Sequence, residues 1–290
     1  GIRDCLLSRG LGDVYKRQME PVPAFYFPTD TSPMPGVSVR PQAVNLPSYA
    51  AAPAFTAQWA QFNGSTSYGA SSGFGPVTAG QNGAMSVWLR NDQATWNSPT
   101  ANALDLRIAA GTQRLILRTN TGGRMTLSLN NDGANPGAHS FYSAPGNVPF
   151  VVGQAYHILA AWTATGITVY VNGVLVYTAT WTSHVLNGSV LTQLGVGGLA
   201  TNSARWTGAI GHLWLDLNLP APIDFSVAAN REDFALAGVP VNVGPDGSLV
   251  NGTVPELYFD GAGAAWSNKG SAGNVTLTGT LTAATPAPSY

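Results

Sequence analysis

Short runs of apolar residues, most of them alternating with polar ones, recur along the chain from residue 55 onward. The clearest cover residues 156–162, 167–171 and 174–177, and they are rich in β-branched and aromatic residues. Alternation with a period of two is typical of a strand with one buried face. Asn172 and Gly173 join the last two runs, and an Asn-Gly pair indicates a tight hairpin because both residues tolerate a positive φ. These residues therefore predict an antiparallel meander of three strands.

Further runs of strand length lie on both sides of this meander. They cover residues 55–62, 85–90, 104–108, 114–118 and 125–129. Gly, Asn and Pro separate them at intervals of about 8–12 residues, which is typical of a β-sandwich. A parallel α/β sheet would need amphipathic helices of about 10–15 residues between the strands, and the pattern shows none. We therefore predict an all-β fold, an antiparallel jelly-roll sandwich.

Three stretches carry a resemblance to a known superfamily. Residues 156–176 hold Tyr-His, an apolar run that ends in Trp, and Ile-Thr-Val-Tyr-Val-Asn-Gly-Val-Leu-Val; residues 62–68 have the sequence FNGSTSY, and residues 208–215 have GAIGHLWL. They resemble the central strands, the aromatic–Asp–Gly–polar–aromatic first strand and the closing Gly-x-Ile-Asp-Glu strand of concanavalin A-like lectins and glucanases, the superfamily that includes laminin G-like domains. The resemblance covers roughly residues 55–217 and implies a jelly-roll sandwich. It does not fix a function, since the superfamily includes lectins, hydrolases and structural modules.

The part of the chain before residue 55 differs from this β-rich region. Residues 1–18 hold four of the thirteen basic residues and the only cysteine. They resemble translated sequencing-adaptor read-through at the ends of assembled metagenomic fragments; the alternative is a genuine N-terminal arm, whereas a signal peptide would need an apolar segment that is missing. Residues 19–54 hold eight prolines, a density that favours an extended arm.

A third region follows the predicted sandwich of residues 55–220. Residues 221–290 are predicted to form a short helix and C-terminal strands that pack on the sandwich. The helix is expected over residues 224–234, with Ser226 as its N-cap and Phe225 and Phe234 as its apolar contacts. Residues 224–284 are similar to the C-terminal extension of laminin G-like proteins encoded by bacteriophages and prophages. That resemblance implies a structural protein associated with a virion.

Composition narrows the range of partners. Charged residues make up 9% of the chain and the net charge is −1, so no basic surplus is present to neutralise nucleic acid phosphates. No apolar run approaches the ~20 residues that cross a bilayer. The 44% hydrophobic content and eight Trp predict a packed core rather than disorder. Low charge with many Ser, Thr, Asn and Gly residues favours an extracellular or virion surface.

The sequence lacks the usual catalytic motifs. Glycosidases of this superfamily carry Glu-x-Asp-x-Glu on one strand, which points alternate carboxylates into one groove. Here the acids are scattered, and the four histidines show no metal-binding spacing. The glycine-rich residues 195–198 open no helix and are expected to be a turn. We therefore predict no catalysis; the alternative is a glycoside hydrolase whose acids are paired by the fold.

The superfamily resemblance also raises the question of calcium. In laminin G-like domains the acidic ligands commonly come from the first-strand loop and the closing strand. Those positions here hold Ser65, Thr66, Ser67, Gly211 and His212. Calcium prefers several oxygen ligands that include carboxylates, so we expect no cofactor at the familiar site. Residues 130–133 could supply an oxygen-rich loop for calcium, or form an Asx-type turn between strands.

Saccharide binding is the activity that this architecture supports most naturally. A carbohydrate site needs an aromatic or apolar wall and a few polar side chains that reach the hydroxyl groups. Two loops combine these features, and we predict ligand binding by Asp92, Trp96, Asn97, His139 and Tyr142. The alternative is that the bulky loop aromatics plug the ends of the sandwich or bury a subunit interface. The expected function is a non-catalytic carbohydrate-binding or adhesion module whose partners are glycans or other virion or cell-surface proteins, with a homo-oligomer as one option.

Overall fold

The computed structural model describes most of the chain after residue 54. The described residues are 55, 57–96, 100–108, 113–131, 139–181, 186, 188–198, 204–261 and 263–290. Within them, the side chains of residues 70–74, 113, 130, 131, 139–141 and 264 are not described. The adaptor-like residues 1–18 and the Pro-rich residues 19–54 lie outside the described part.

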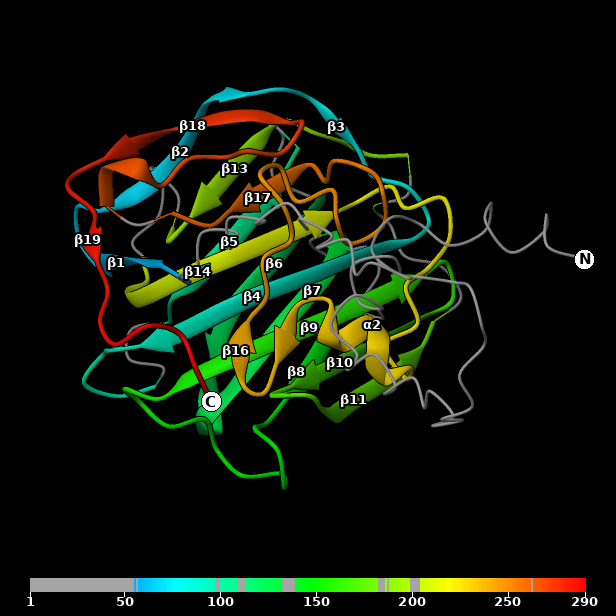
Figure 1. Ribbon diagram of the computed structural model, residues 1–290, viewed down its shortest axis with the longest axis horizontal. Helices are drawn as coiled ribbons and strands as arrows, with labels where there is room; N and C mark the ends of the chain where they lie inside the picture. Colours follow the sequence, from blue (N-terminus) through cyan, green and yellow to red (C-terminus); the bar gives the residue numbers. More distant parts are fainter. Residues whose placement is uncertain are drawn as a thin grey trace, which may run out of the picture. The chain divides into compact units, whose positions relative to one another are not determined.

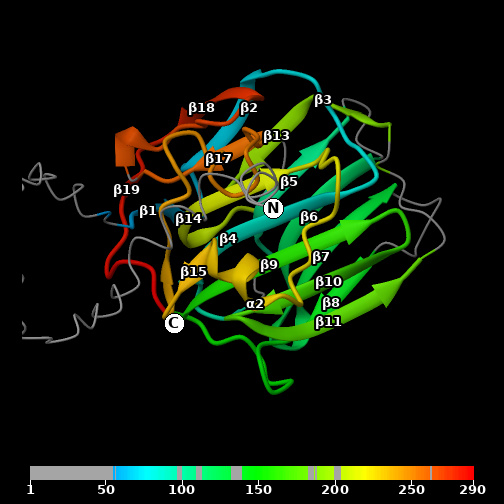
Figure 2. The ribbon, with the colours of Figure 1, turned by 45° about the vertical axis from the view of Figure 1, so that its right-hand side comes forward.

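Two large antiparallel sheets form the framework of the described chain (Figures 1 and 2). In spatial order, the first sheet contains β11 (Val174–Thr180), β10 (Gly166–Val171), β9 (Ala155–Thr163), β4 (Gly83–Asn91), β14 (Thr207–Asp216), β1 (Trp59–Asn63) and β19 (Thr282–Ala283), and β17 (Leu257–Phe259) also pairs with β14. The second sheet contains β18 (Gly273–Thr278), β2 (Tyr68–Phe74), β13 (Gln193–Val196), β5 (Asn102–Arg107), β6 (Gln113–Asn120), β7 (Arg124–Asn131) and β8 (His139–Tyr142). The prediction of an all-β, antiparallel sandwich is confirmed.

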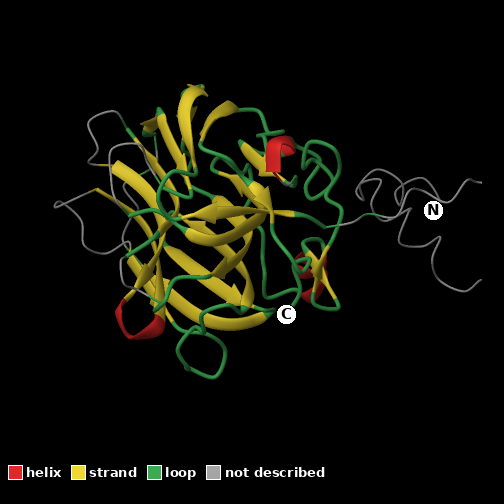
Figure 3. Cartoon of the chain, turned by 90° about the vertical axis from the view of Figure 1, so that its left-hand side faces the viewer, coloured by secondary structure: helices red, strands yellow, loops and turns green. Residues whose placement is uncertain are grey.

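In the part of the chain that the structure describes, helix is confined to a few short segments (Figure 3). The α-helix, α2 (Ala228–Glu232), is shorter than the predicted 224–234. Its N-cap is Val227 rather than Ser226, and no side chain caps it. Ser226 instead donates its backbone N–H to Asp224 Oδ1 at 2.9 Å, so an Asx-type turn ends before the helix begins. The remaining elements are η1 (Thr121–Gly123), η2 (Gly263–Ala265), the pair β3 (Val77–Thr78) with β12 (Val190–Leu191), and the pair β15 (Ala235–Leu236) with β16 (Val239–Pro240).

The meander predicted from the sequence is formed by β9, β10 and β11. Asn172 and Gly173 lie at φ 50° and 75°, the left-handed conformation that a tight hairpin requires. Asn172 also fastens the hairpin to β9, because its backbone N–H donates to His157 O and its Oδ1 accepts from His157 N, both at 2.9 Å. The Asn-Gly pair therefore determines the hairpin, and its Asn residue also attaches the hairpin to the neighbouring strand β9.

The main core lies between the two sheets and consists of the inward-facing residues of both. Each fully buried Leu, Ile or Val side chain contributes about 1.5–3 kcal/mol relative to an exposed one. Core residues contributed by the long strands are Met85, Val87, Leu89, Leu104, Leu106, Leu115, Leu117, Leu127, Leu129, Ile158, Ala160, Trp162, Leu194, Val196 and Ile210.

A second core covers the outer face of the first sheet. Leu159, Tyr170 and Trp214 project from β9, β10 and β14 and pack against the segment that contains Phe225 and Phe234. Figures 1 and 2 show α2, β15 and β16 lying over β9 and β10 on this side. Phe225 and Phe234, the predicted apolar contacts of the helix, are buried in this core and their rings meet edge to face at 5.8 Å, although no residue of α2 itself is buried.

The segment after residue 220 also supplies strands to both sheets. β17 pairs with β14, β19 pairs with β1, and β18 pairs with β2. Strand pairing across residue 220 means that the C-terminal segment completes the edges of the sandwich as well as covering one face.

Candidate functional site

A hollow of about 340 Å³ lies where the end of β8 and the loop after it approach β11. One part of its wall is polar and the other is apolar, the combination expected of a site for a small hydroxylated ligand. The residues that line it are Arg124, Tyr142, Ser143, Ala144, Gly146, Asn147, Leu175 and Val176.

The loop that forms one wall of this hollow is held by backbone hydrogen bonds. Ala144 N donates to Val148 O at 3.0 Å, which closes the turn, and Phe150 N donates to Gly123 O at 2.7 Å, which fastens the loop to η1. Gly146 and Asn147 occupy the turn at φ 81° and 58°, a conformation that these two residue types tolerate best. The polar groups of the wall are therefore set on a fixed backbone.

Tyr142 is the predicted site residue that lines the hollow. Its side chain is only 2% exposed, and its ring meets Phe150 edge to face at 6.1 Å. Burial raises the pKa of the hydroxyl, which therefore stays protonated. The hydroxyl has no hydrogen-bond partner among the residues that the structure describes. A buried polar group without a partner costs about 1–3 kcal/mol, so a ligand or water that bonds to this hydroxyl gains that much.

Trp96 belongs to the core rather than to an open site. Its side chain is 7% exposed and its ring stacks on Phe150 at 5.0 Å. The edge of Tyr156 closes another side at 6.3 Å, and Trp96 Nε1 donates to Arg124 O at 2.7 Å. A ring packed in this way has no face on which a sugar could stack. This packing agrees with the alternative given for Trp96, in which a loop aromatic plugs the end of the sandwich.

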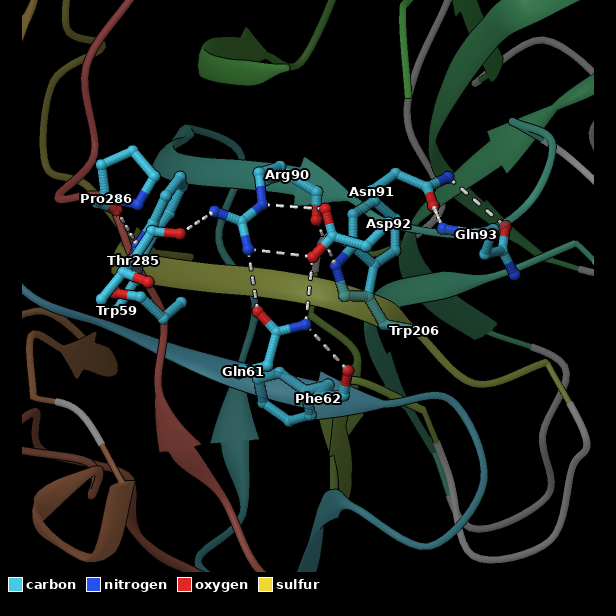
Figure 4. Close-up of polar contacts among 11 residues, drawn as sticks. Trp59, Gln61, Phe62, Arg90, Asn91, Asp92, Gln93, Trp206, Thr285 and Pro286 are labelled. Carbon is cyan, nitrogen blue, oxygen red and sulfur yellow. Dashed lines mark hydrogen bonds and ion pairs between the residues drawn. The ribbon is translucent and has the colours of Figure 1, made fainter. Parts of the chain in front are cut away.

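Asp92 is occupied by an ion pair, shown in Figure 4. Arg90 donates from Nε to Asp92 Oδ1 at 2.8 Å and from Nη2 to Oδ2 at 2.9 Å, and Gln61 Nε2 also donates to Oδ2 at 3.1 Å. Arg90 Nη1 further donates to Thr285 O at 2.7 Å. This network joins β1, β4 and the chain after β19. Asp92 therefore has a structural contact in place of the predicted ligand contact, and it does not line the hollow.

The other two predicted site residues cannot be assigned to the hollow. Asn97 lies outside the described residues, and His139 is described only as the backbone of β8, where it pairs with Ser128. The sequence prediction missed Arg124, Ser143 and Asn147, although the Pro-Gly-Asn order of residues 145–147 marks a turn next to Tyr142.

The residues at the calcium positions of the family do not fit calcium. Asn63 Oδ1 accepts hydrogen bonds from the backbone N–H groups of Ser65, Thr66 and Ser67 at 3.0, 2.9 and 2.9 Å, so the loop closes on an amide without a carboxylate. On the closing strand, His212 is buried, and desolvation lowers its pKa to about 4. Among the described residues, no group of three or more His, Cys, Asp and Glu could hold a metal ion.

One pair of carboxyl groups is brought together by the fold alone. Asp216 ends β14, Glu256 precedes β17, and the two side chains are hydrogen-bonded to each other. Burial raises the pKa of both groups, that of Glu256 to about 7, although Glu256 also accepts from Leu217 N at 2.7 Å. Glycosidases hold their carboxyl groups about 5–5.5 or 6.5–9.5 Å apart, farther than a hydrogen bond allows. Neither residue lines the hollow beside Tyr142.

Comparison with known families identifies the fold. Residues 63–215, more than half of the chain, match the laminin G-type family described as the concanavalin A-like lectin/glucanases superfamily. The chain belongs to this superfamily. The three stretches that suggested it are the first strand, the meander and the closing strand, here β1, β9–β11 and β14. A search of curated proteins gave no match.

Solved structures share the fold of this superfamily member at low sequence identity. A "putative carbohydrate binding protein" from Bacteroides ovatus aligns with a TM-score of 0.54 and 15% identity, over 82% of this chain and 62% of that one. Domains LG4-5 of the mouse laminin α1 chain align at 0.42 and 17%, over 56% and 43% of the two chains, and the heptameric SAP-like pentraxin of Limulus polyphemus at 0.44 and 13%, over 57% and 78%. The chain thus spans less than two thirds of the Bacteroides protein, and the similarity shows the fold.

The described part of the chain contains no helix that is long and apolar enough to span a membrane.

Proposed function

We propose that this protein is a non-catalytic carbohydrate-binding module that holds a saccharide in the hollow beside Tyr142. The observation that carries the proposal is the buried Tyr142 hydroxyl, which lines the hollow without a partner among the described residues. Membership of a superfamily with many lectins supports it, as does the shared fold with a Bacteroides protein described as carbohydrate-binding. Catalysis is left out of the proposal because the carboxyl pair Asp216–Glu256 lies outside the hollow.

The chemistry of the wall suits a sugar ring. The Tyr142 hydroxyl can donate one hydrogen bond and accept others, and a saccharide hydroxyl does the same. Arg124, Ser143 and Asn147 add charged and neutral partners. Leu175 is 49% exposed and presents an apolar surface to the C–H side of the ring. Binding energy would come from satisfying the buried hydroxyl and covering Leu175.

The test is a glycan array probed with the full chain, with and without added calcium. Tyr142→Phe keeps the ring and removes the hydroxyl, and it should reduce binding of the best glycan at least tenfold. Tyr68→Phe is the matched control, because Tyr68 lies on β2 beneath Arg205 and away from the hollow. Binding that survives Tyr142→Phe would contradict the assigned site. Binding that requires calcium would show that the site needs a metal ion, which the proposal does not include.

The hydrolase alternative is tested on the same glycans. Incubation with each bound polysaccharide should release no reducing ends, because no carboxyl group lines the hollow. Release of sugar that disappears in Glu256→Gln would instead favour the glycoside hydrolase, with the carboxyl pair as its acids.

An assembly role on a virion is the second candidate, favoured by exposed apolar side chains next to the hollow. Val148, Val174 and Leu175 are each about half exposed, and Leu175 belongs to the edge strand β11. Contiguous exposed apolar surface is typical of interaction sites. The resemblance of residues 224–284 to phage-encoded proteins supports the same role. Defined oligomers in light scattering, together with no glycan bound on the array, would favour this function over carbohydrate binding.

A further inference from the structure

Three aromatic rings stack on the outer face of the first sheet, away from Tyr142. Trp88 on β4 and His157 on β9 are cross-strand partners, and their rings lie 4.7 Å apart and nearly parallel, at 13°. Tyr290 stacks on Trp88 at 5.4 Å and on His157 at 6.3 Å. The Trp88 and His157 rings carry nitrogen atoms, which need hydrogen-bond partners when they are buried.

The nitrogen atoms of this stack are incompletely satisfied. His157 is 1% exposed, and its Nε2 pairs with Ser86 Oγ at 2.9 Å. Its Nδ1 is buried and has no hydrogen-bond partner among the described residues, and the same holds for Trp88 Nε1. Buried polar groups are nearly always hydrogen-bonded, so each of these two nitrogens calls for a partner, and of the two residues His157 is the one that lines a hollow.

A second hollow, of about 260 Å³, adjoins His157. It lies between the β10–β11 hairpin, α2 and the turn that joins β15 to β16, which Figures 1 and 2 show on the covered side of the first sheet. Among its lining residues are His157, Gly173, Arg231, Glu232, Gly238 and Tyr290. Small-molecule sites commonly occupy about 300–1,000 Å³, so this one has room for a single small ring.

The charges around this hollow favour a neutral ligand. Burial, with a smaller contribution from His212, lowers the pKa of His157 to about 3, so the imidazole is neutral at pH 7. Arg231 and Glu232 are neighbours of opposite sign, and Arg231 is already bound to the carbonyl groups of Phe225 and Ser226. With a neutral His157, the lining side chains therefore carry one positive and one negative charge, and the wall has no net charge that would select an ion.

The imidazole of His157 also restricts which functional group of a ligand can form a hydrogen bond with it. Ser86 Oγ can donate to His157 Nε2 or accept from it, and the choice leaves Nδ1 as a donor or as an acceptor. A hydroxyl group can bond to Nδ1 in either tautomer, whereas a carbonyl or an ammonium group can match only one. We propose that this hollow is a second binding site, which takes one neutral, polyhydroxylated ring and bonds a hydroxyl of that ring to His157 Nδ1. The ligand class rests on the proposed carbohydrate function, but the residues are independent of Tyr142.

The test follows the His157 ring in the full chain labelled with ¹⁵N-histidine, with D-glucose, D-galactose and myo-inositol as probes. The His157→Gln variant, checked for folding by near-UV circular dichroism, assigns the His157 signals. At pH 7, at least one probe should shift the Nδ1 signal of His157 saturably. Tyr290→Ala and Glu232→Gln, which change half-buried or exposed side chains of the wall, should reduce the affinity for that probe at least fivefold. Tyr68→Phe should leave the affinity unchanged.

The outcomes separate this site from the one at Tyr142. No shift of the His157 signal with any probe would overturn the second site, whether or not glycans bind elsewhere. A shift that persists at full affinity in both Tyr290→Ala and Glu232→Gln would also overturn it. A shift that is unaffected by Tyr142→Phe, with no array binding lost in that variant, would support the second site and contradict the first.

Discussion

The two faces of the first sheet are built from the same strands but are stabilised differently. Inward-facing residues such as Val87, Ile158 and Ile210 are purely apolar and meet the second sheet. Outward-facing residues include Trp59, Trp88, His157, Tyr170 and Trp214, each an apolar ring with a polar atom. The aliphatic side chains of the inner layer stabilise it through buried apolar area, whereas the rings of the outer layer also carry polar atoms that need hydrogen-bond partners.

The C-terminal segment supplies many of those partners. Trp59 Nε1 donates to Ala284 O at 3.1 Å and to Pro286 O at 2.8 Å, and Trp214 Nε1 donates to Gly247 O at 3.0 Å. Trp88 Nε1 and His157 Nδ1, which belong to the same face, find no hydrogen-bond partner among the described residues. The same covered face therefore contains ring nitrogens with structural hydrogen bonds and ring nitrogens without a partner among the described residues.

The largest effect is expected from the inner layer. Leu117→Ala removes a fully buried side chain from β6 and should reduce the free energy of unfolding by about 2–5 kcal/mol, because lost burial and the residual cavity both destabilise. Urea denaturation followed by tryptophan fluorescence measures this. Leu236→Ala, at an exposed position of β15, is the control and should change stability by less than about 0.5 kcal/mol. A loss below about 1 kcal/mol for Leu117→Ala would mean that the inner layer is not the main source of stability.

A smaller and more local effect is expected from the outer layer. Trp59→Phe leaves the carbonyl groups of Ala284 and Pro286 without their indole donor and should cost about 1–3 kcal/mol. Hydrogen exchange should become faster in residues 284–290. Trp214→Phe is the matched control, because its indole bonds to Gly247 and it should loosen that region instead. Equal exchange changes in both variants would show that the outer layer opens as one unit.

The pH dependence of stability should show opposite contributions from two buried sites. Glu256 titrates near 4.5 when unfolded and near 7 when folded, so between these values the folded chain binds more protons. The stabilisation of the folded chain by Glu256 is therefore fully present below pH 4.5 and is lost as the pH rises through 7. His157 has the reverse sign, since its pKa falls from 6.5 to about 3 on folding and acid favours the unfolded chain.

Melting temperatures between pH 4 and 8 measure these two contributions. Glu256→Gln should remove most of the decrease in stability that Glu256 causes as the pH rises from 5 to 7. It should leave unchanged the decrease that His157 causes as the pH falls below 6. A wild-type melting temperature that rises steadily from pH 5 to 8, unchanged in slope by Glu256→Gln, would contradict the raised pKa of the carboxyl pair.

The smallest effect is expected at Asp92. Asp92→Asn weakens the ion pair with Arg90, which lies near the surface with side chains 13% and 27% exposed, so the cost should be about 0.2–1 kcal/mol. Glycan binding should not change, because Asp92 does not line the hollow. Chemical denaturation tests the predicted loss of stability, and the glycan array tests the prediction that binding does not change. A glycan bound by the native chain and lost in Asp92→Asn would restore Asp92 as a ligand residue.

Local patterns predicted the strands but only part of the site. The alternation in residues 167–171 and the Asn172-Gly173 turn were sufficient for the meander, and the structure confirms it. The same reasoning took residues 195–198 for a turn, whereas Gly195 and Val196 are the last residues of β13 and only the bend follows. A glycine in a central strand carries no signal in its own side chain, so its neighbours in the sheet decide its state.

Residue types also could not say which aromatics would line a hollow. Trp96 and Tyr142 look alike in the sequence, since each lies beside Asn, Asp or His residues outside the predicted core. Both are buried in the structure, at 7% and 2% exposure, and the difference is that Tyr142 lines the hollow beside β11 whereas Trp96 stacks on Phe150 away from it. That choice depends on a loop that packs back onto the sandwich, and no local periodicity describes such packing.

The sequence by itself determined the strands, the hairpin and the superfamily, because alternation and turn chemistry act over a few neighbouring residues. Only the tertiary structure decided which side chains meet. It paired Asp216 with Glu256 across forty residues of chain, placed Trp96 in the core, and laid the C-terminal segment over Trp88 and His157. These outcomes depend on the register and packing of strands that are distant in sequence, and a long-range pairing leaves no repeating pattern in the residues that it joins.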